Sequence, residues 1–383
     1  MATNNKILNC PPLRFPEFAD EWKQTTLGEI AEVNPTTTKS LPLRFQYIDL
    51  ESVEKGRIVK NNVLTREDAP SRAQRILNNG DVIFQMVRPY QQNNLYLNLK
   101  GNIPVVASTG YAQLRGFQSS LFLYYAVHTP NFLGEVLNRC TGSNYPAINS
   151  ADLSTISLSL PSLAEQKKIA GFLSLIDERI ESCSETIKER KREKAALLNQ
   201  LFGQKLRFPQ FSDEWQQTTL GEVLDYEQPT NYIVRNTEYS SNVSLIPVLT
   251  ANKSFILGYT YEQDAYNKGK CIILDDFTLD IKFVNFPFKV KSSAIKILVA
   301  KDGTNILFIY NCLLFLRLSE QEKDHKRHYI SEIQPLIVAL PSLSEQNKIA
   351  DFLSLIDERI EVEEELLKQY EMQKKYLLRQ MFI

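Results

Sequence analysis

Two stretches of the chain carry apolar residues at alternating spacings of four and three, the pattern of a helix that packs lengthwise against another helix. We call these positions the seam of each helix. The first seam consists of Ile169, Leu173, Ile176, Ile180, Cys183, Ile187, Leu197 and Leu201. The second seam consists of Ile349, Leu353, Ile356, Ile360, Leu367, Tyr370, Leu377 and Met381. Each helix is the natural partner of the other, and we predict that they form an antiparallel coiled coil.

The start and end of these helices are also indicated. Ser162 to Glu165 and Ser342 to Glu345 fit a capping box, in which the serine oxygen accepts a free amide and the glutamate reaches back to the cap. Gly203 fits a C-terminal cap of the first helix. Roughly 40 residues at about 1.5 Å each make a rod of about 60 Å.

Polar residues interrupt both seams. Arg190 and Lys194 do so in the first helix, and Glu363 and Lys374 in the second. A polar residue in a coiled-coil seam can specify its register. We therefore interpret these four residues as candidates for setting the register of the pair.

Outside the helices, short apolar runs separated by turn residues predict strands. In residues 30–159 these runs are FQYIDL, NNGDVIFQMV, GNIPVVAS, TGYAQLRG and ISLSL, whereas residues 119–137 look helical. In residues 223–339 they are VSLIPVLTANKSFILGYTY, GKCIILDDF and SSAIKILVA. Both regions are expected to be mixed α/β domains in which strands dominate.

The chain is an internal repeat. Residues 160–181 and 340–361 are identical at 19 of 22 positions, and LRFPEFADEWKQTTLGE (13–29) returns as LRFPQFSDEWQQTTLGE (206–222). The two pairs are offset by 340 − 160 = 180 and 206 − 13 = 193 residues, and the sequence between them differs almost completely. Such a long period is unlike the 20–50-residue repeats of solenoids. We infer a fixed scaffold that presents two different recognition domains.

The repeats divide the chain into six parts. These are a lead-in and docking segment (1–29), a first domain (30–159), a first helix (160–203), a second docking segment (204–222), a second domain (223–339) and a second helix (340–383). The first helix runs into LRFP, and the second ends where an LRFP would follow. We predict that residues 13–18 pack beside the end of the second helix, which gives a pseudo-two-fold α+β architecture.

Composition narrows the class of protein. The 383 residues are 43% apolar, which is enough for packed cores, and no apolar run approaches the roughly 20 residues of a membrane span. The start of the chain lacks the apolar core of a signal peptide, so we expect a cytoplasmic protein. Five scattered cysteines without a CxxC motif indicate neither disulfides nor a zinc site, and the net charge of −1 is uninformative about DNA.

These residues together closely resemble the specificity subunit of type I restriction-modification enzymes, over nearly the whole chain. The resemblance rests on the paired helical motifs, the paired LRFP entries, GDVIF with VRPY and ASTGY in the first domain, and TANK, GY and RHYISEI in the second. It implies that each variable domain is a target recognition domain reading one half of an asymmetric, split DNA sequence. It also implies that the helices act as a ruler and hold two methyltransferase subunits, joined by a restriction subunit in the full complex.

The repeated FLSLIDERIE segment supports a shared partner independently. Beyond the seam it carries a second apolar pair in each copy, Phe172 with Leu175 and Phe352 with Leu355. One matching surface per copy suits two copies of one partner. The alternative is that these residues seal the helices onto the neighbouring domains.

Base reading requires polar and basic side chains on rigid loops or helix ends. The candidates in the first domain are Arg88, Tyr90, Gln91, Gln92, Asn93, Asn94, Thr141, Ser143, Asn144 and Tyr145. Those in the second domain are Thr250, Asn252, Lys253, Thr278, Lys282, Lys326, Arg327 and Tyr329. For each loop the alternative is an ordinary polar connection, and Tyr329 is equally a candidate for the core. Two domains at most about 60 Å apart reach major grooves a turn or more apart, which favours a split, non-palindromic target.

The search for catalytic chemistry finds little. The sequence contains no NPPY-type tetrapeptide, no GxxxxGK[ST] loop and no HExxH motif, and Asp280-Ile281-Lys282 matches a nuclease DxK only by three residues. His128, His325 and His328 have no metal-ligand spacing. We expect a non-catalytic chain without metal or cofactor, in which S-adenosylmethionine belongs to the methyltransferase partner. The rival hypotheses are a scaffold that binds protein or glycan, and a self-contained nuclease or methylase.

Overall fold

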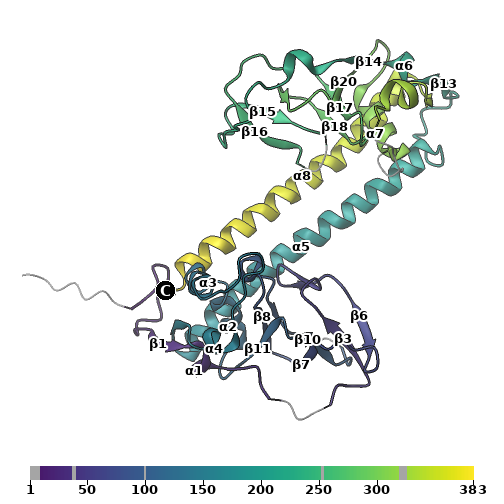
Figure 1. The fold of residues 1–383 in the computed structure, drawn as a ribbon. Helices are drawn as coiled ribbons and strands as arrows, with labels where there is room; N and C mark the ends of the chain where they lie inside the picture. The colour runs from purple at the N-terminus through teal and green to yellow at the C-terminus, as the bar shows by residue number, and fades with distance from the viewer. Residues whose placement is uncertain (1–8, 37–39, 99–100, 252–253, 319–325) are drawn as a thin grey trace, which may run out of the picture. The chain divides into compact units, whose positions relative to one another are not determined.

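The computed structural model describes residues 9–36, 40–98, 101–251, 254–318 and 326–383. The chain divides into two compact units. Unit 1 comprises Met1–Ser184 and Glu365–Ile383, and unit 2 comprises Glu185–Glu364. Each unit therefore combines one strand-rich domain with a segment of both long helices, which Figure 1 labels α5 (Leu163–Phe202) and α8 (Leu343–Gln380).

Within each unit the two helix segments run antiparallel. In unit 2, Lys191 pairs with Glu364 at 2.6 Å and Lys194 with Asp357 at 2.6 Å. Residue numbers therefore rise along α5 in the direction in which they fall along α8. In unit 1, Lys374 pairs with Asp177 at 2.6 Å. Further along α8, the Gln380 carbonyl meets the docking segment that also binds the start of α5. Most of the predicted seam is buried in both units, because its apolar side chains leave water together, whereas Ile180, Leu197, Ile356, Leu367 and Tyr370 are half-buried.

Unit 1 is built on two four-stranded sheets. One has the order β2 (Ala31–Val33), β11 (Tyr111–Gly116), β8 (Val82–Gln85), β9 (Leu95–Tyr96), and the other β6 (Asn62–Thr65), β3 (Arg44–Ile48), β10 (Val105–Ser108), β7 (Ala73–Leu77). Two short pairs join β1 (Lys23–Thr26) to β12 (Ser157–Leu160) and β4 (Val53–Glu54) to β5 (Arg57–Ile58). The helices are α1 (Leu27–Ile30), α2 (Ser120–Ala126), α3 (Pro130–Asn138) and α4 (Ser150–Ser154), with the short turn η1 (Pro89–Gln91). One hydrophobic core joins the first sheet, α2 and α3 to the long-helix segments of unit 1, which lie beside them in Figure 1.

Unit 2 repeats this plan with fewer strands among its described residues. Its main sheet has the order β14 (Leu224–Glu227), β20 (Ile295–Ala300), β17 (Cys271–Asp275), β18 (Ile281–Val284), and its second sheet β16 (Ile256–Thr260), β15 (Ile246–Leu249), β19 (Lys289–Val290). The short pair is β13 (Gln216–Thr219) with β21 (Ile337–Leu340). The helical elements are α6 (Leu220–Val223), η2 (Pro229–Tyr232), α7 (Ile306–Leu316) and the π-helical turn η4 (Tyr329–Ile333).

The first sheets of the two units match strand for strand. Each is entirely antiparallel and places the strands in the same order, so β8 corresponds to β17, β9 to β18 and β11 to β20. The loop after β8 therefore corresponds to the loop after β17. This equivalence defines which surfaces of the two units can be compared.

The docking segments (Leu13–Glu29 and Leu206–Glu222) pack as predicted. The Leu13 amide donates to the Gln380 carbonyl at 2.8 Å, and the Leu206 amide donates to the Gln200 carbonyl at 3.0 Å. The ring of Phe15 meets Phe172 edge-on, as the ring of Phe208 meets Phe352 in unit 2. Each docking segment thus contacts the end of one long helix and the start of the other.

Both predicted capping boxes at the long helices form only in part. The Ser162 hydroxyl accepts the Glu165 amide at 3.4 Å, but the Glu165 carboxylate turns to the guanidinium of Arg14, at 2.7 and 2.8 Å. Glu345 does the same with Arg207 at 2.8 Å. A bidentate, charge-assisted contact is stronger than a bond to a neutral amide, which explains the change. In both pairs it also raises the pKa of the arginine.

Three further details depart from the predictions. The helix expected over residues 119–137 is broken into α2 and α3, because Thr129 caps a new helix that begins at Pro130. Helix α7 was not predicted, since its sequence ILFIYNCLLFL is apolar on all sides and has no period. Gly203 follows the end of α5, but the left-handed residue is Gln204; a side chain at Gly203 would lie 2.5 Å from the Asn199 carbonyl.

Candidate nucleic-acid interface

The two loops predicted as readers in the first domain lie side by side in unit 1. We call residues 86–94 the β8–β9 loop and residues 139–149 the α3–α4 loop. Val87 and Ala147 form a β-bridge, and the Arg88 amide donates to the Pro146 carbonyl at 2.7 Å. The structure therefore brings together residues that lie more than 50 positions apart in the sequence.

Several of the candidate side chains in these loops reach the surface. Tyr90 is 52% exposed and Tyr145 is 64% exposed. The other exposed candidates are Gln91, Thr141, Ser143 and Asn144. Large exposed aromatic and polar side chains on a braced loop can stack on a sugar or hydrogen-bond to a base edge.

The remaining candidates of the β8–β9 loop hold the loop itself. Asn94 is buried, and its side-chain oxygen accepts the Gln85 amide at 2.8 Å. Gln85 in turn accepts the Asn93 amide and donates to the Gln91 side chain. The Gln92 side chain donates to the His128 carbonyl at 3.4 Å. These amides brace the loop, while Tyr90 stays exposed and Arg88 is half-buried.

His128 anchors this loop to α2. Its Nδ1 lies 2.6 Å from the Tyr124 carbonyl, and its Nε2 lies 3.3 Å from the side-chain nitrogen of Asn94. The carbonyl requires a proton on Nδ1, so Nε2 accepts from Asn94 and the ring is neutral. Burial lowers the pKa of His128 to about 4, which agrees with that tautomer.

The anchoring continues into the helix pair. Tyr124 packs against the His128 ring, and the neighbouring Tyr125 hydroxyl donates to Asp177 at 2.9 Å. Asp177 also accepts Lys374. Through Tyr124 and Tyr125, α2 thus connects the loop to both helix segments of unit 1.

Arg88 has an unusual conformation at the centre of this surface. Its φ of 54° and ψ of 53° are left-handed, and its guanidinium carbon lies 4.3 Å from the centre of the Tyr145 ring. A non-glycine residue in this region is uncommon and persists where the surroundings enforce it. Here Pro89 and the Pro146 carbonyl enforce it.

The equivalent loops of unit 2 also meet. Arg327 stacks on Phe277 at 5.8 Å, so the arginine now comes from the segment before η4 and the aromatic ring from the β17–β18 loop (residues 276–280). Lys326, Arg327 and Thr278 are exposed, and Lys282 is half-buried on β18. Thr278 donates to Asp280 at 2.9 Å, so this aspartate of the DxK match is engaged within its own loop.

The remaining candidates in unit 2 are Tyr329, Thr250, Asn252 and Lys253. Tyr329 is fully buried and stacks edge-on against Tyr226, so its ring belongs to the core. Thr250 is half-buried, and its amide donates to the Phe255 carbonyl at 3.0 Å. Asn252 and Lys253 lie outside the described residues.

A buried ionic cluster holds the unit 2 loops, and the sequence did not reveal it. The Asp276 carboxylate accepts the Tyr329 amide at 2.7 Å and the His328 amide at 3.1 Å. Lys296 lies 3.6 Å away, and both side chains are almost fully buried. The available signal is a charged residue inside an apolar run, Asp276 after CIILD and Lys296 within AIKILVA. Gln85 within VIFQMV is likewise a polar, though uncharged, residue inside an apolar run.

The candidate partner residues separate into two kinds. Leu175 and Leu355 are each 57% exposed, whereas Phe172 and Phe352 are half-buried against the docking segments. The phenylalanines thus seal the helices onto the domains. The leucines remain available to a partner.

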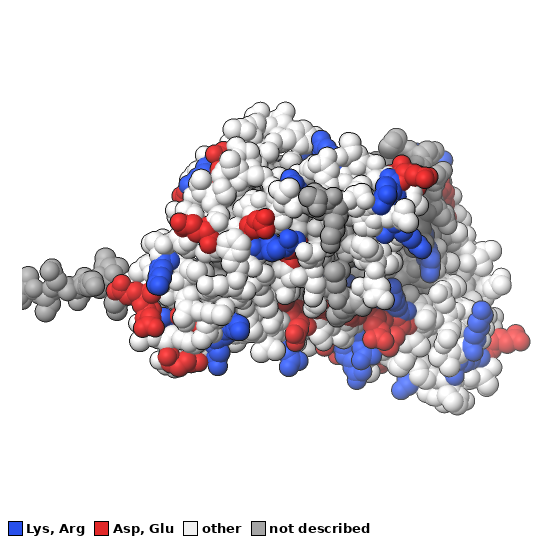
Figure 2. Space-filling model, turned by 90° about the horizontal axis from the view of Figure 1, so that it is seen from below, with Lys and Arg blue, Asp and Glu red and all other residues white. Residues whose placement is uncertain are grey.

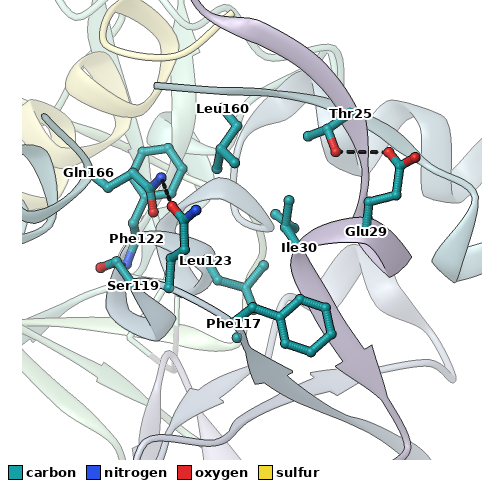
Figure 3. A pocket seen from close by; sticks show the side chains of 11 residues that line it. Thr25, Glu29, Ile30, Phe117, Ser119, Phe122, Leu123, Leu160 and Gln166 are labelled. Atoms are coloured by element: carbon teal, nitrogen blue, oxygen red, sulfur yellow. Dashed lines mark hydrogen bonds between the residues drawn. The ribbon is translucent and has the colours of Figure 1, made fainter. Parts of the chain in front are cut away.

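Unit 1 also holds a small pocket of about 150 Å³ beside the start of α5 (Figure 3). Gln166 donates to Gln118 at one end, at 2.7 Å, and Thr25 donates to Glu29 at the other, at 2.9 Å. Apolar side chains, among them Phe117 and Leu160, line the space between. This pocket is too small for a nucleotide and lies apart from the reader loops in the chain.

Charge alone does not mark a DNA surface. On the face drawn in Figure 2, basic and acidic side chains are interspersed. Among the residues that the structure describes, no group of histidine, cysteine, aspartate and glutamate could hold a metal ion. None of the helices in the described ranges has the length and apolarity needed to cross a bilayer.

The two units share the same main sheet, docking segment and helix pairing but differ in their loop surfaces. This arrangement defines a recognition protein with two targets, and comparison with known proteins agrees. Residues 19–190 and 212–372 match the type I restriction modification DNA specificity domain. The chain belongs to this family, whose specificity subunits are the non-catalytic DNA recognition components of type I restriction-modification complexes.

Individual relatives carry the same description. The specificity subunit of the type I restriction enzyme EcoR124I/EcoR124II from Escherichia coli is 37% identical over 171 residues, which cover 42% of each chain. The MjaVIII specificity subunit from Methanocaldococcus jannaschii is 22% identical over 96% of this chain and 92% of its own length. The crystal structure of a type I S subunit from M. genitalium shares the fold with a TM-score of 0.67 at 16% identity, over 98% of this chain and 99% of that chain.

Proposed function

We propose that this chain directs a type I restriction-modification complex to a split, asymmetric DNA sequence, with one half-site read by each unit. The observation that carries the proposal is the pairing of equivalent loops with unlike side chains. The β8–β9 loop joins the α3–α4 loop in unit 1, and the β17–β18 loop joins the segment before η4 in unit 2. Two surfaces at the same place in one fold, with different chemistry, suit two different base sequences.

The proposal includes two copies of a methyltransferase subunit. Its support is the exposed leucine at the same position of each helix, Leu175 and Leu355. An exposed apolar residue that recurs within an identical ten-residue segment fits a surface that the same partner covers twice. In this proposal a restriction subunit joins the full complex, S-adenosylmethionine is bound by the methyltransferase, and the assembly works on DNA in the cytoplasm.

The test of DNA reading is a methylome. The chain is co-expressed with its cognate methyltransferase subunit in a methylation-free host, and modified bases are sequenced directly. We expect one split, asymmetric motif. Replacing residues 30–159 by the same region of another family member should change one half of the motif only. A contiguous palindrome would contradict the two-unit reading, and assembly without modification would favour a scaffold that binds another ligand.

The test of partner number uses the exposed leucines. Leu175→Asp and Leu355→Asp should each lower the number of methyltransferase copies from two to one in native mass spectrometry, and the double variant should bind none. Met372→Asp is the matched control, because Met372 is an exposed apolar residue of α8 that does not recur in α5. Two bound copies in the double variant would exclude these leucines from the interface.

A further inference from the structure

We propose that Arg88 reads a guanine in the half-site of unit 1 and that Tyr145 orients its guanidinium for this contact. The inference rests on the proposed function. It adds one reading residue, one positioning residue and one base.

The backbone fixes where the Arg88 side chain starts. Its left-handed conformation is held by the hydrogen bond from its amide to Pro146 and by the turn η1, in which the Gln91 amide donates to the Arg88 carbonyl at 3.0 Å. The loop that carries this turn is in turn held by Asn94 and His128. A reading residue on a mobile loop would lose its aim, and Arg88 is on a braced one.

The Tyr145 ring restricts where the Arg88 guanidinium can lie. The guanidinium lies over the ring of Tyr145 at 4.3 Å, and that ring is largely exposed. All N–H donors of a guanidinium lie in its plane, so an aromatic ring on its face leaves the donor edge open. The pair thus presents a flat fork of donors beside an exposed ring.

Among the residues that the structure describes, no partner binds the side-chain donors of Arg88, and its two terminal guanidinium nitrogens are the ones left for an outside acceptor. Its Nε is buried without a hydrogen-bond partner. The ion pairs among the described residues of unit 1 neutralise other arginines instead: Arg14 through Glu165 and Arg115 through Asp81, at 2.7 and 2.9 Å. A charge that is stacked, oriented and uncompensated fits an acceptor that arrives from outside.

The acceptor that matches this geometry is the O6 and N7 edge of guanine. Two parallel N–H donors bind it in the major groove, and this is the commonest specific contact of arginine with DNA. A phosphate also accepts a guanidinium fork. A phosphate contact carries no base preference, however, so the loss of preference at one base pair distinguishes the two acceptors.

The test compares methylation motifs of the full chain with its methyltransferase partner. The variants are Arg88→Lys, Arg88→Ala, Tyr145→Phe and Tyr145→Ala, with Arg327→Lys in unit 2 as the matched control. The wild-type motif should contain a G·C pair in the half assigned to residues 30–159 by domain replacement. Both Arg88 variants should lose about 10- to 100-fold of the preference for that pair, as one bidentate contact predicts.

The tyrosine variants examine positioning. Tyr145→Phe keeps the ring and should keep the motif, while Tyr145→Ala should weaken the preference for the same G·C pair. Arg327→Lys should leave that half-site unchanged. For variants that modify too little DNA in cells, binding of the purified complex to duplexes substituted at each base pair of the half-site gives the same preference.

Three outcomes would overturn the inference. A half-site without any G·C pair leaves Arg88 nothing to read. An unchanged motif in Arg88→Lys, or a uniform loss over all positions in Arg88→Ala, assigns the residue to phosphate. Failure of the proposed function looks different, because the wild-type chain itself would then give no split motif.

Discussion

In unit 1, Trp22 lies edge-on to Phe122 and Phe382, and in unit 2, Trp215 lies edge-on to Phe308 and Phe202. The arginine of each docking segment binds the glutamate at the start of a long helix. An aspartate of each FLSLIDERIE segment binds a lysine of the other helix. These repeated contacts, which we call the frame, attach each domain to the helices.

The reader loops share none of these contacts. Unit 1 braces its loop with neutral amides and a neutral histidine, whereas unit 2 uses a buried aspartate and lysine. The cation–π pair joins equivalent loops in both units, but the arginine and the aromatic ring change sides. The frame therefore maintains the same fold in both units. The loops can differ between the units, provided that the buried polar groups of each loop find hydrogen-bond partners.

The largest effect should come from breaking the frame. Glu165→Gln removes the charge that binds Arg14 and accepts the Trp22 indole at 3.3 Å, and should destabilise unit 1 by about 3 kcal/mol. Glu345→Gln should cost unit 2 less, because the Arg207 side chain is 26% exposed and that of Arg14 only 13%. The chain has two tryptophans, one per unit, so Trp215→Phe makes fluorescence report unit 1 and Trp22→Phe makes it report unit 2.

Denaturant unfolding in these two backgrounds gives the comparison. Lys168→Ala is the control, since the Lys168–Glu17 ion pair is exposed and should change little. Equal shifts of both reporters after either substitution would mean that the units unfold as one block.

A smaller, pH-dependent effect should distinguish the loops. The pKa of His128 is about 4 in the folded chain and about 6.5 in the unfolded chain, so the unfolded state takes up the proton first as the pH falls. Unit 1 should therefore lose about 2 kcal/mol of stability between roughly pH 6.5 and pH 4.5 from this residue alone.

The measurement is the unfolding midpoint of Trp215→Phe against pH, with and without His128→Gln. The difference between the two curves isolates the histidine from the other titrating groups. Parallel curves would show that His128 is already protonated or solvated in the folded unit.

The smallest effect should come from the seam. Lys194 crosses to Asp357 and is mostly buried, whereas the ion pair that Arg190 makes among the described residues is with Glu193 of its own helix. Lys194→Leu should cost about 1 kcal/mol because it leaves Asp357 half-buried without its cation, while Arg190→Leu should be near neutral. Unfolding of unit 2 in the Trp22→Phe background measures both. A cost for Arg190→Leu as large as that for Lys194→Leu would mean that the crossing Lys194–Asp357 pair stabilises unit 2 no more than the Arg190–Glu193 pair within α5.

The helices, the main strands and the place of the first docking segment could be predicted from the sequence, because these features are periodic or repeated. The seam positions, the main strands and the packing of residues 13–18 on the second helix all follow from patterns visible in the chain. The identical copies also made each prediction for one unit a prediction for the other.

The loops could not be predicted in the same way, because their contacts join residues far apart. Asn94, for example, meets His128 across 34 positions. No local rule places Arg88 on Tyr145, since that requires the bridge between Val87 and Ala147. Whether a polar loop residue faces outward or braces the loop depends on such partners, so Gln92 and Asn94 turned inward while Tyr90 stayed exposed.

The contact between residues 13 and 380 also sets the order in which a newly made chain can fold. Unit 2 is one continuous stretch, and all of its residues exist once position 364 has been added. Unit 1 lacks Phe382 for Trp22 and the Gln380 carbonyl for Leu13 until the last residues are translated. Domains usually mature in the order of synthesis. Here unit 2 can fold before unit 1, and unit 1 can complete its fold only when residues 365–383 have been added.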